Sequence, residues 1–194
     1  LRDAEIPFAL RGAGHSPSGE VLCDGGAVLD LRGLSAIVPV SAADEVRVQG
    51  GTLWLPLCQA LAGRDRAPRV LTDNPHTTVA GTLSVGGFGD SSHRFGLQVD
   101  CVRGATLLLP TGERCELASD DPLLRYALAG RGQLGILAEL TLPLWRRSWD
   151  LSARVLHFAD AESFVAASIQ IAEMGRFDYV RARAHAVPPY AVSA

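Results

Sequence analysis

The sequence predicts an α+β fold that consists of one domain over about residues 1–143 and the beginning of a second domain from residue 151. Three observations support this prediction. The chain has 194 residues, 47% of them apolar, which is enough for one domain and part of another. Short apolar runs bounded by glycine alternate with stretches that have the spacing of amphipathic helices. Tryptophan and arginine then gather over residues 144–150, which is typical of a linker.

The composition argues against several classes of partner. All 18 basic residues are Arg, and with 21 acidic residues they leave a formal net charge of -3, so nucleic acid is not an expected partner. No apolar run approaches the roughly 18 residues of a membrane span, so no membrane association is expected. A zinc site or a disulfide framework is not expected either, and reduced, buried thiols are, because no Cys-x-x-Cys pair occurs among Cys23, Cys58, Cys101 and Cys115.

The first elements are expected to be short strands. Residues 6–10 form an apolar run that ends at a glycine-rich segment. Residues 27–31 and 36–40 are predicted to be two more strands, joined by a turn. Over residues 45–49, valines alternate with polar neighbours until Gly50-Gly51 ends the run, which predicts a half-buried strand and a tight turn.

Two helices are expected in the first domain. Apolar residues recur at helical spacing over residues 53–61, and Gly63 is suited to end that helix. The second helix has clearer signals, because Asp121 is a candidate N-cap, Pro122 suits the first helical position and Gly130 can end the helix.

The remaining elements of the first domain are strands. Residues 105–110 and 114–117 flank Thr111-Gly112, which predicts a hairpin. Residues 135–142 alternate apolar and polar positions in their second half and predict another strand.

The last part of the chain predicts a strand, a helix and a strand. These elements are expected over residues 151–158, 161–174 and 178–183, with Asp160 as the N-cap of the helix. Three such elements leave an apolar sheet face with too little to cover it. We therefore expect this part to be the beginning of a domain that the chain does not complete.

The most informative segment is the glycine-rich loop over residues 11–19 (Arg-Gly-Ala-Gly-His-Ser-Pro-Ser-Gly). Glycines directly after a strand permit positive φ and let successive N–H groups converge on a diphosphate. The loop is not a Rossmann fingerprint, because no long helix pattern follows and Pro17 interrupts one. Two interpretations remain on spacing alone, a phosphate-binding loop and a structural turn with a lone histidine.

The Arg-Gly-x-Gly-His-Ser segment resembles the signature of FAD-binding domains of the vanillyl-alcohol oxidase and p-cresol methylhydroxylase type. In many members of that family, the histidine is bonded to the 8α carbon of the flavin. The resemblance implies that His15 is the attachment site and that the surrounding loop wraps the pyrophosphate. An electron-withdrawing imidazolium would raise the flavin potential. The alternative is a noncovalent family member in which His15 only hydrogen-bonds.

Two further segments add to the resemblance. Residues 72–73 (Thr-Asp) and 78–87 (Thr-Val-Ala-Gly-Thr-Leu-Ser-Val-Gly-Gly) resemble cytokinin dehydrogenases, and Asp73 takes the position of their catalytic aspartate. Residues 130–137 resemble the family's Gly-x-Gly-Gln-x-Gly-Ile/Val segment, which lies by the adenine end of FAD. The resemblance implies cofactor contacts at Leu10, Gly12, Ala13, Gly14, His15, Ser16, Glu20, Thr78, Ser84, Phe88 and Leu137.

The sequence also departs from the family pattern. Residues 79–81 (Val-Ala-Gly) replace the flavin-linked cysteine of bicovalent members, so a single covalent bond is the most that we predict. Glu20 stands where cytokinin dehydrogenases usually have Gln, and Leu71 and Asn74 replace aromatic residues beside the aspartate. These changes bear on the substrate, a planar adenine derivative, more than on the flavin.

The resemblance implies an incomplete vanillyl-alcohol-oxidase-type FAD-binding domain, followed by the start of an α+β substrate domain. The chain begins with Leu1 and not with Met, so we expect the first βαβ portion and any targeting signal to lie upstream. We expect the rest of the substrate domain to lie downstream. The cytoplasm is the favoured compartment. The isolated chain is then expected to bind FAD poorly or not at all.

A carboxylate beside a flavin can take a proton from a substrate N–H or O–H while the neighbouring C–H leaves as hydride. Asp73 is the candidate for this role, and its alternative role is a helix N-cap or an Asx turn. His76 and His93 are the remaining histidines near this segment and are expected on surface loops. A Ser-His-Asp hydrolase over residues 90–94 is not favoured, since no nucleophile elbow occurs, and no metal site is assigned.

We therefore expect an FAD-dependent oxidoreductase that acts on a small organic substrate, a cytokinin-like amine, and passes electrons to oxygen or a quinone. One alternative is an alcohol or sugar oxidase of the same fold, with Asp73 serving only as a pocket residue. Another is a truncated flavin-binding module without catalytic activity.

Overall fold

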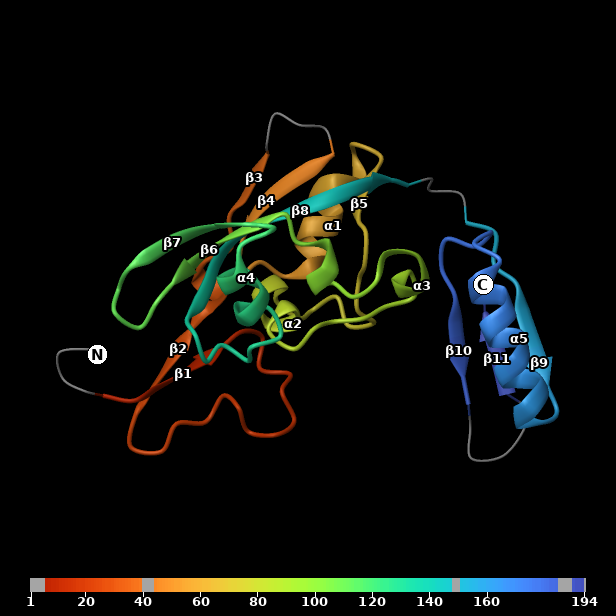
Figure 1. The fold of residues 1–194 in the computed structure, drawn as a ribbon, viewed down its shortest axis with the longest axis horizontal. Helices are drawn as coiled ribbons and strands as arrows, with labels where there is room; N and C mark the ends of the chain where they lie inside the picture. Colours follow the sequence, from red (N-terminus) through yellow and green to blue (C-terminus); the bar gives the residue numbers. More distant parts are fainter. Residues whose placement is uncertain (1–5, 40–43, 148–150, 185–189, 194) are drawn as a thin grey trace.

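The computed structural model shows three β-sheets and five α-helices in the part of the chain that it describes (Figure 1). The described residues are 6–39, 44–147, 151–184 and 190–193. No helix among them is long and apolar enough to cross a membrane.

The first two strands form a small parallel sheet. Strand β1 (Phe8–Arg11) pairs with β2 (Ala27–Asp30), and the glycine-rich loop lies in the connection between them. The sequence predicted a simple turn after β2, whereas the structure has a 3-10 helix, η2 (Leu31–Gly33). The Asp30 carboxylate accepts a hydrogen bond from the backbone N–H of Arg32 and caps η2, and the chain then enters another sheet. The two strands that flank the turn are therefore consecutive in sequence but do not share a sheet.

The central sheet is antiparallel and has the strand order β3-β4-β8-β6-β7. Strand β8 crosses the molecule and pairs with β4 and β6 over most of its length and with β5 at its end (Figure 1). The strands are β3 (Ile37–Pro39), β4 (Glu45–Gln49), β5 (Arg66–Pro68), β6 (Gly104–Leu108), β7 (Arg114–Ala118) and β8 (Ile136–Arg146).

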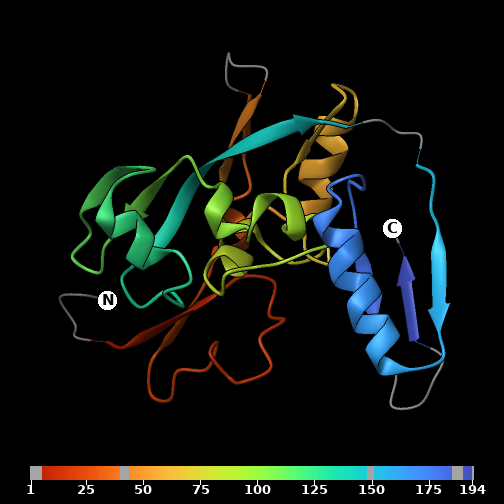
Figure 2. The same cartoon turned by 45° about the vertical axis from the view of Figure 1, so that its right-hand side comes forward.

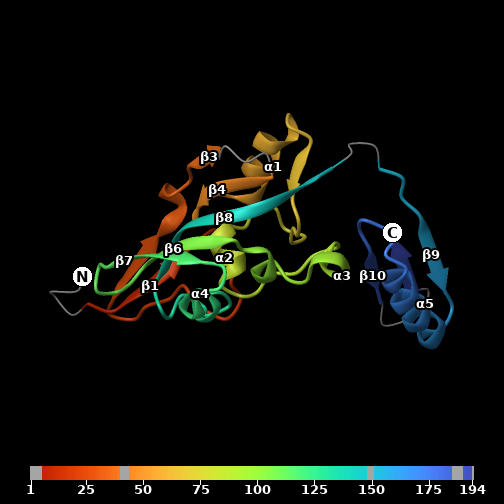
Figure 3. The same cartoon turned by 45° about the horizontal axis from the view of Figure 1, so that its top comes forward.

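Short helices pack against this sheet and complete its hydrophobic core. Helices α2 and α4 lie side by side below strands β6 and β8 (Figure 3). Trp54 of α1 is 2% exposed, and its indole N–H donates to Thr82 at 3.0 Å, so its one polar atom is satisfied within the core. The helices are α1 (Trp54–Ala62), α2 (Val79–Leu83), α3 (Ser92–Phe95) and α4 (Pro122–Ala127), and a 3-10 helix, η3, covers Val99–Cys101.

The last part of the chain forms a separate sheet with one helix. Its strands β9 (Val155–Phe158), β10 (Arg181–Arg183) and β11 (Tyr190–Ser193) are antiparallel in the order β10-β11-β9. Helix α5 (Ala161–Glu173) lies along these strands (Figure 2) and buries Phe164 and Ile171 against an apolar cluster of Phe158, Phe177 and Val180.

The structure confirms the elements that carry local signals, which are β4, the β6–β7 hairpin, α1, and the capped helices α4 and α5. It differs at β8, which continues to Arg146 and so enters the range in which the sequence predicts a linker. Residues 148–150 of that range lie outside the described residues. All four cysteines are free, but only Cys101 is buried, and the other three are half-buried.

Candidate cofactor site

The glycine-rich loop lies tightly against the start of α2. A Cβ atom added at Gly12 would stand 2.2 Å from Oγ1 of Thr78, so no larger residue fits there, and Gly14 has a φ of +78°. Within the described residues, the backbone N–H groups of Ala13, Gly14, His15 and Ser16 donate no hydrogen bond. A series of unpartnered N–H groups on an accessible loop is suited to receive an anion such as a diphosphate.

Helix α2 carries the second motif. Thr78 is its N-cap and accepts a hydrogen bond from the N–H of Gly81 at 3.2 Å, and Thr78 is only 2% exposed. Ser84 is the C-cap, and its hydroxyl donates to the carbonyl of Ala80 at 2.7 Å. The structure thus shows both hydroxyls holding their own helix, and their contact with flavin stays a prediction.

The third motif wraps around the end of α2. The N–H of Ala129 donates to the carbonyl of Leu83 at 2.8 Å, and the N–H of Arg131 donates to that of Ser84 at 2.9 Å. Ala129 and Arg131 reach these positions with positive φ values of 58° and 54°. Three motifs that are far apart in sequence therefore meet at one helix.

Contacts also join the third motif to the first. A Cβ atom at Gly132 would lie 3.0 Å from a methyl carbon of Leu10, and Arg131 forms a loose ion pair with Glu20 at 3.9 Å. Leu137 differs from the other predicted contacts, because its side chain is 4% exposed and belongs to the core, which leaves only its main chain for a ligand.

His15 lies beside the loop that carries Asp73. Its Nδ1 is 3.4 Å from the side-chain nitrogen of Asn74, the residue that follows Asp73. The imidazole is exposed, and the β1–β2 connection and the segment that follows α2 also expose large apolar side chains, with Leu22, Val85 and Phe88 at 77%, 61% and 73% exposure. Exposed apolar side chains next to a polar loop mark a surface that a ligand can cover.

Neither alternative role of Asp73 is found. Thr78 is the N-cap of α2, and the Asx turn is made by Asn74, whose Oδ1 accepts the N–H of His76 at 3.0 Å. The Asp73 side chain is 70% exposed, and its Oδ1 accepts a hydrogen bond from Nη2 of Arg181 at 2.5 Å. The loop therefore presents this carboxylate to Arg181, in the second part of the chain.

Asp73 lies at the edge of a cavity of about 390 Å3 between the two parts of the chain. The carboxylates of Asp90 and Asp73 raise the pKa of the Arg181 guanidinium, with the Asp90 hydrogen bond as the larger cause. Burial raises the pKa of Tyr179 above its ordinary value. The lining includes Leu71, Thr72, Asp73, Asp90, Tyr179 and Arg181.

The remaining candidates have structural roles. His93 is half-buried, and its ring nitrogens lie 3.1 Å and 3.0 Å from the carbonyls of Asp90 and Phe177, whereas His76 is exposed as expected. Ser91 donates its hydroxyl to the carbonyl of Arg69 at 2.6 Å. These contacts leave no Ser-His-Asp arrangement among residues 90–94, all of which the structure describes.

Aromatic and charged contacts join the two parts of the chain. The ring of Trp145 meets the rings of Phe95 and Tyr179 edge-on, with centroids 5.0 Å and 5.9 Å away. The guanidinium of Arg94 lies 5.5 Å from the centre of Trp145 and forms an ion pair with Asp178. The cluster that predicted a linker therefore belongs to the contact between the two parts.

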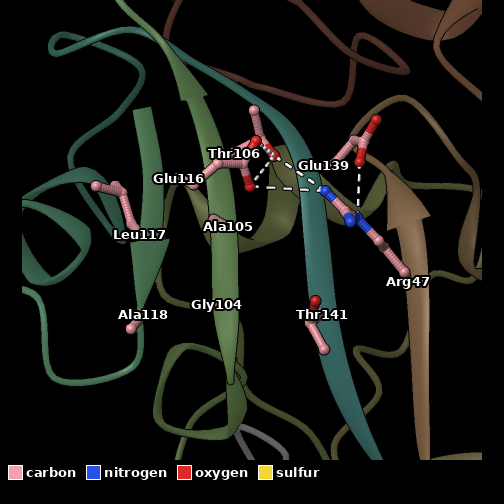
Figure 4. A pocket seen from close by; sticks show the side chains of 9 residues that line it. All are labelled: Arg47, Gly104, Ala105, Thr106, Glu116, Leu117, Ala118, Glu139 and Thr141. Atoms are coloured by element: carbon pink, nitrogen blue, oxygen red, sulfur yellow. Dashed lines mark hydrogen bonds and ion pairs between the residues drawn. The ribbon is translucent and has the colours of Figure 1, made fainter. Parts of the chain in front are cut away.

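A second cavity, of about 320 Å3, lies over strands β4, β6, β7 and β8 (Figure 4). Arg47 pairs there with Glu139 at 2.7 Å and with Glu116 at 3.6 Å. The hydroxyl of Thr106 donates to both oxygens of Glu116 at 3.0 Å and is the largest cause of the lowered pKa of that carboxyl. Each carboxylate is matched by a cation, which is typical of a surface ion-pair network. The described residues contain no cluster of His, Cys, Asp and Glu suited to a metal ion.

The chain is similar to a known protein family and to several known proteins. A family model described as FAD binding domain matches residues 1–118. A protein named uncharacterized oxidoreductase ORF5 in fasciation locus, from Rhodococcoides fascians, is 33% identical over 180 residues, which cover 92% of this chain and 41% of that protein. Cytokinin dehydrogenase 7 from Oryza sativa subsp. japonica is 34% identical over 187 residues, covering 90% of this chain and 36% of that protein.

A solved structure, that of 6-hydroxy-D-nicotine oxidase from Arthrobacter nicotinovorans, superposes on the chain with a TM-score of 0.75 and 26% identity. The superposition covers 98% of this chain and 44% of the oxidase chain. The chain therefore spans less than half the length of these relatives.

Proposed function

Since this chain belongs to the family of FAD binding domains, whose model matches residues 1–118, we propose that it is the cofactor-binding part of an FAD-dependent oxidoreductase. The observation that carries this proposal is the meeting of three distant motifs at α2, with His15 beside the loop of Asp73. This arrangement can hold one elongated ligand along the loop and a reacting group next to a carboxylate.

The residues present fit FAD. The free N–H groups of residues 13–16 would bind the diphosphate, and the exposed apolar surface that includes Phe88 would face the ring system. We propose a single covalent bond, through His15, since residues 79–81 contain no cysteine to make a second one. Residues 1–143 would form the cofactor domain, and residues from 151 would begin the substrate domain.

FAD, when bound, supplies an acceptor for two electrons. Asp73 takes the proton from a substrate N–H or O–H, and the adjacent C–H bond breaks so that its hydrogen leaves with both bonding electrons. An amine substrate is thereby oxidised to an imine. Oxygen or a quinone would serve as the final electron acceptor.

We propose a secondary amine, cytokinin-like, as the substrate. Support comes from the names of two relatives, of which one is a cytokinin dehydrogenase and the other a 6-hydroxynicotine oxidase. The test is anaerobic bleaching of the flavin in the full-length protein. Secondary amines are expected to bleach it, and bleaching by alcohols or sugars alone would establish the alternative oxidase. A flavin that no substrate of either class bleaches would favour the binding module without catalytic activity.

The covalent bond has its own test. Flavin is expected to stay with the acid-precipitated wild-type protein and to be released from His15→Ala. His76→Ala is the matched control, because His76 is also an exposed histidine of this region. Flavin that stays with His15→Ala after precipitation would refute the attachment.

A further inference from the structure

We propose that Arg181 is a positioning residue for Asp73, holding Oδ1 of that carboxylate so that Oδ2 is the atom that takes the substrate proton. This inference rests on the proposed function, and it adds to it a residue from the second part of the chain that prepares the base in the first.

The guanidinium of Arg181 is fixed before it reaches Asp73. Its Nε and Nη2 donate to the two oxygens of Asp90 at 3.0 Å and 2.7 Å. Such a two-point contact between a planar guanidinium and a carboxylate sets the orientation of both groups. Asp90 is therefore the anchor, and Arg181 is held in one plane.

The same Nη2 also donates to Oδ1 of Asp73 at 2.5 Å. Within the described residues, Oδ2 of Asp73 has no hydrogen-bond partner. Since Asp73 lines the cavity between the two parts of the chain, its unoccupied oxygen is available to a ligand there. The two oxygens of this carboxylate thus have different roles.

Asp73 needs such a contact because its own segment does little to hold it. Residues 70–74 have no helix or strand structure, and the side chain is 70% exposed, so an unheld carboxylate would sample several rotamers. A general base acts well only when it stays within hydrogen-bond reach of the proton that it removes. Arg181 provides that restraint from strand β10, in the second part of the chain.

Other contacts hold the second part of the chain against the first, so the role of Arg181 can be separated from docking. Val180 donates its N–H to the carbonyl of Asp90 at 2.8 Å, and the Arg94–Asp178 ion pair joins the same two parts. Asp178→Asn removes one ion pair between the parts without touching Asp73. It is the matched control for Arg181→Met.

The experiment measures the limiting rate of anaerobic flavin reduction by an amine in the full-length protein. Arg181→Met is expected to lower this rate roughly 10- to 100-fold while the substrate dissociation constant changes little. Arg181→Lys should recover only part of the rate, because an ammonium cannot make the two-point contact. Asp178→Asn should stay within about twofold of wild type, and Arg181→Met should have no further effect in an Asp73→Asn background.

Thermal unfolding of the same variants provides a readout that does not depend on the reaction. The Tm changes of Asp73→Asn and Arg181→Met are expected to be non-additive in the double variant, because the two side chains share one contact. Additive changes, or an equal loss of rate in Asp178→Asn, would overturn the role of Arg181. If neither an amine nor an alcohol reduces the flavin of the wild-type protein, the proposed function is refuted. The Tm values of the single and double variants would still show whether Asp73 and Arg181 interact.

Discussion

Gly12 offers the sharpest test of how the cofactor loop is built. An alanine there would place its Cβ 2.2 Å from Oγ1 of Thr78, well inside van der Waals contact. Thr78 cannot easily move, because it is 2% exposed and caps α2 through the N–H of Gly81. Gly12→Ala therefore either strains the loop or displaces the cap.

The magnitude follows from these two costs. Overpacking a tight site costs about 1–3 kcal/mol, and the loss of an N-cap costs about 1 kcal/mol. Because the loop can respond in either way, we expect Gly12→Ala to lower the free energy of unfolding by about 1–3 kcal/mol and to weaken FAD binding as well. Gly63→Ala is the matched control, since Gly63 has a φ of −68° and a Cβ there meets nothing within 4 Å.

Urea unfolding of the full-length protein gives the free energies. Removing Oγ1 with Thr78→Ala should cost about 1 kcal/mol by itself and should make Gly12→Ala nearly harmless in the double variant. The reasoning is refuted if Gly12→Ala costs as much in the Thr78→Ala background as in wild type, or no more than Gly63→Ala.

Three further outcomes are expected. Asp73→Asn should slow anaerobic flavin reduction by roughly 100- to 10,000-fold with unchanged flavin content, measured by stopped-flow absorbance. Asp121→Ala should lower the free energy of unfolding by about 1 kcal/mol because it removes the cap on the N–H of Leu123, whereas Asp120→Ala should change it little. The Arg32 guanidinium lowers the pKa of Asp30 to about 2, so the stabilisation from this pair is present above the ordinary pKa of 3.8 and is lost as the pH falls toward 2. A carboxyl NMR titration should show the pKa of Asp30 returning toward 3.8 in Arg32→Met.

The elements that the sequence predicted correctly are those with complete local signals. Strand β4 has alternating valines and a Gly-Gly stop, and α5 has an N-cap, Asp160, with an apolar stripe behind it. The strands and α-helices that the sequence missed are β5, α2, α3 and β11, of three to five residues each, and it also missed the 3-10 helices η2 and η3. Strand β5 pairs only with the far end of β8, and α2 is stabilised by its contacts with the other motifs. Elements this short gain their stability from partners distant in sequence, which a local pattern does not contain.

In the candidate site, too, some residues could be identified from the sequence and one could not. The residues of the loop, α2 and Asp73 were all singled out by motif resemblance, and their contacts with a cofactor or substrate stay predictions. The structure adds that Nδ1 of His15 lies 3.4 Å from the side-chain nitrogen of Asn74. Arg181 was not singled out, because it is 108 residues from Asp73 and stands in a segment whose only signal was that of a strand.

The sequence by itself determined the glycine-rich loop, the helix caps and the chemical groups available for a cofactor, because backbone freedom, capping and functional groups belong to single residues and their neighbours. Only the tertiary structure decided that three motifs meet at α2 and that Arg181 joins Asp90 to Asp73. Those contacts depend on how two sheets and their loops pack together. Such packing is set by the burial of the whole chain and not by any one segment.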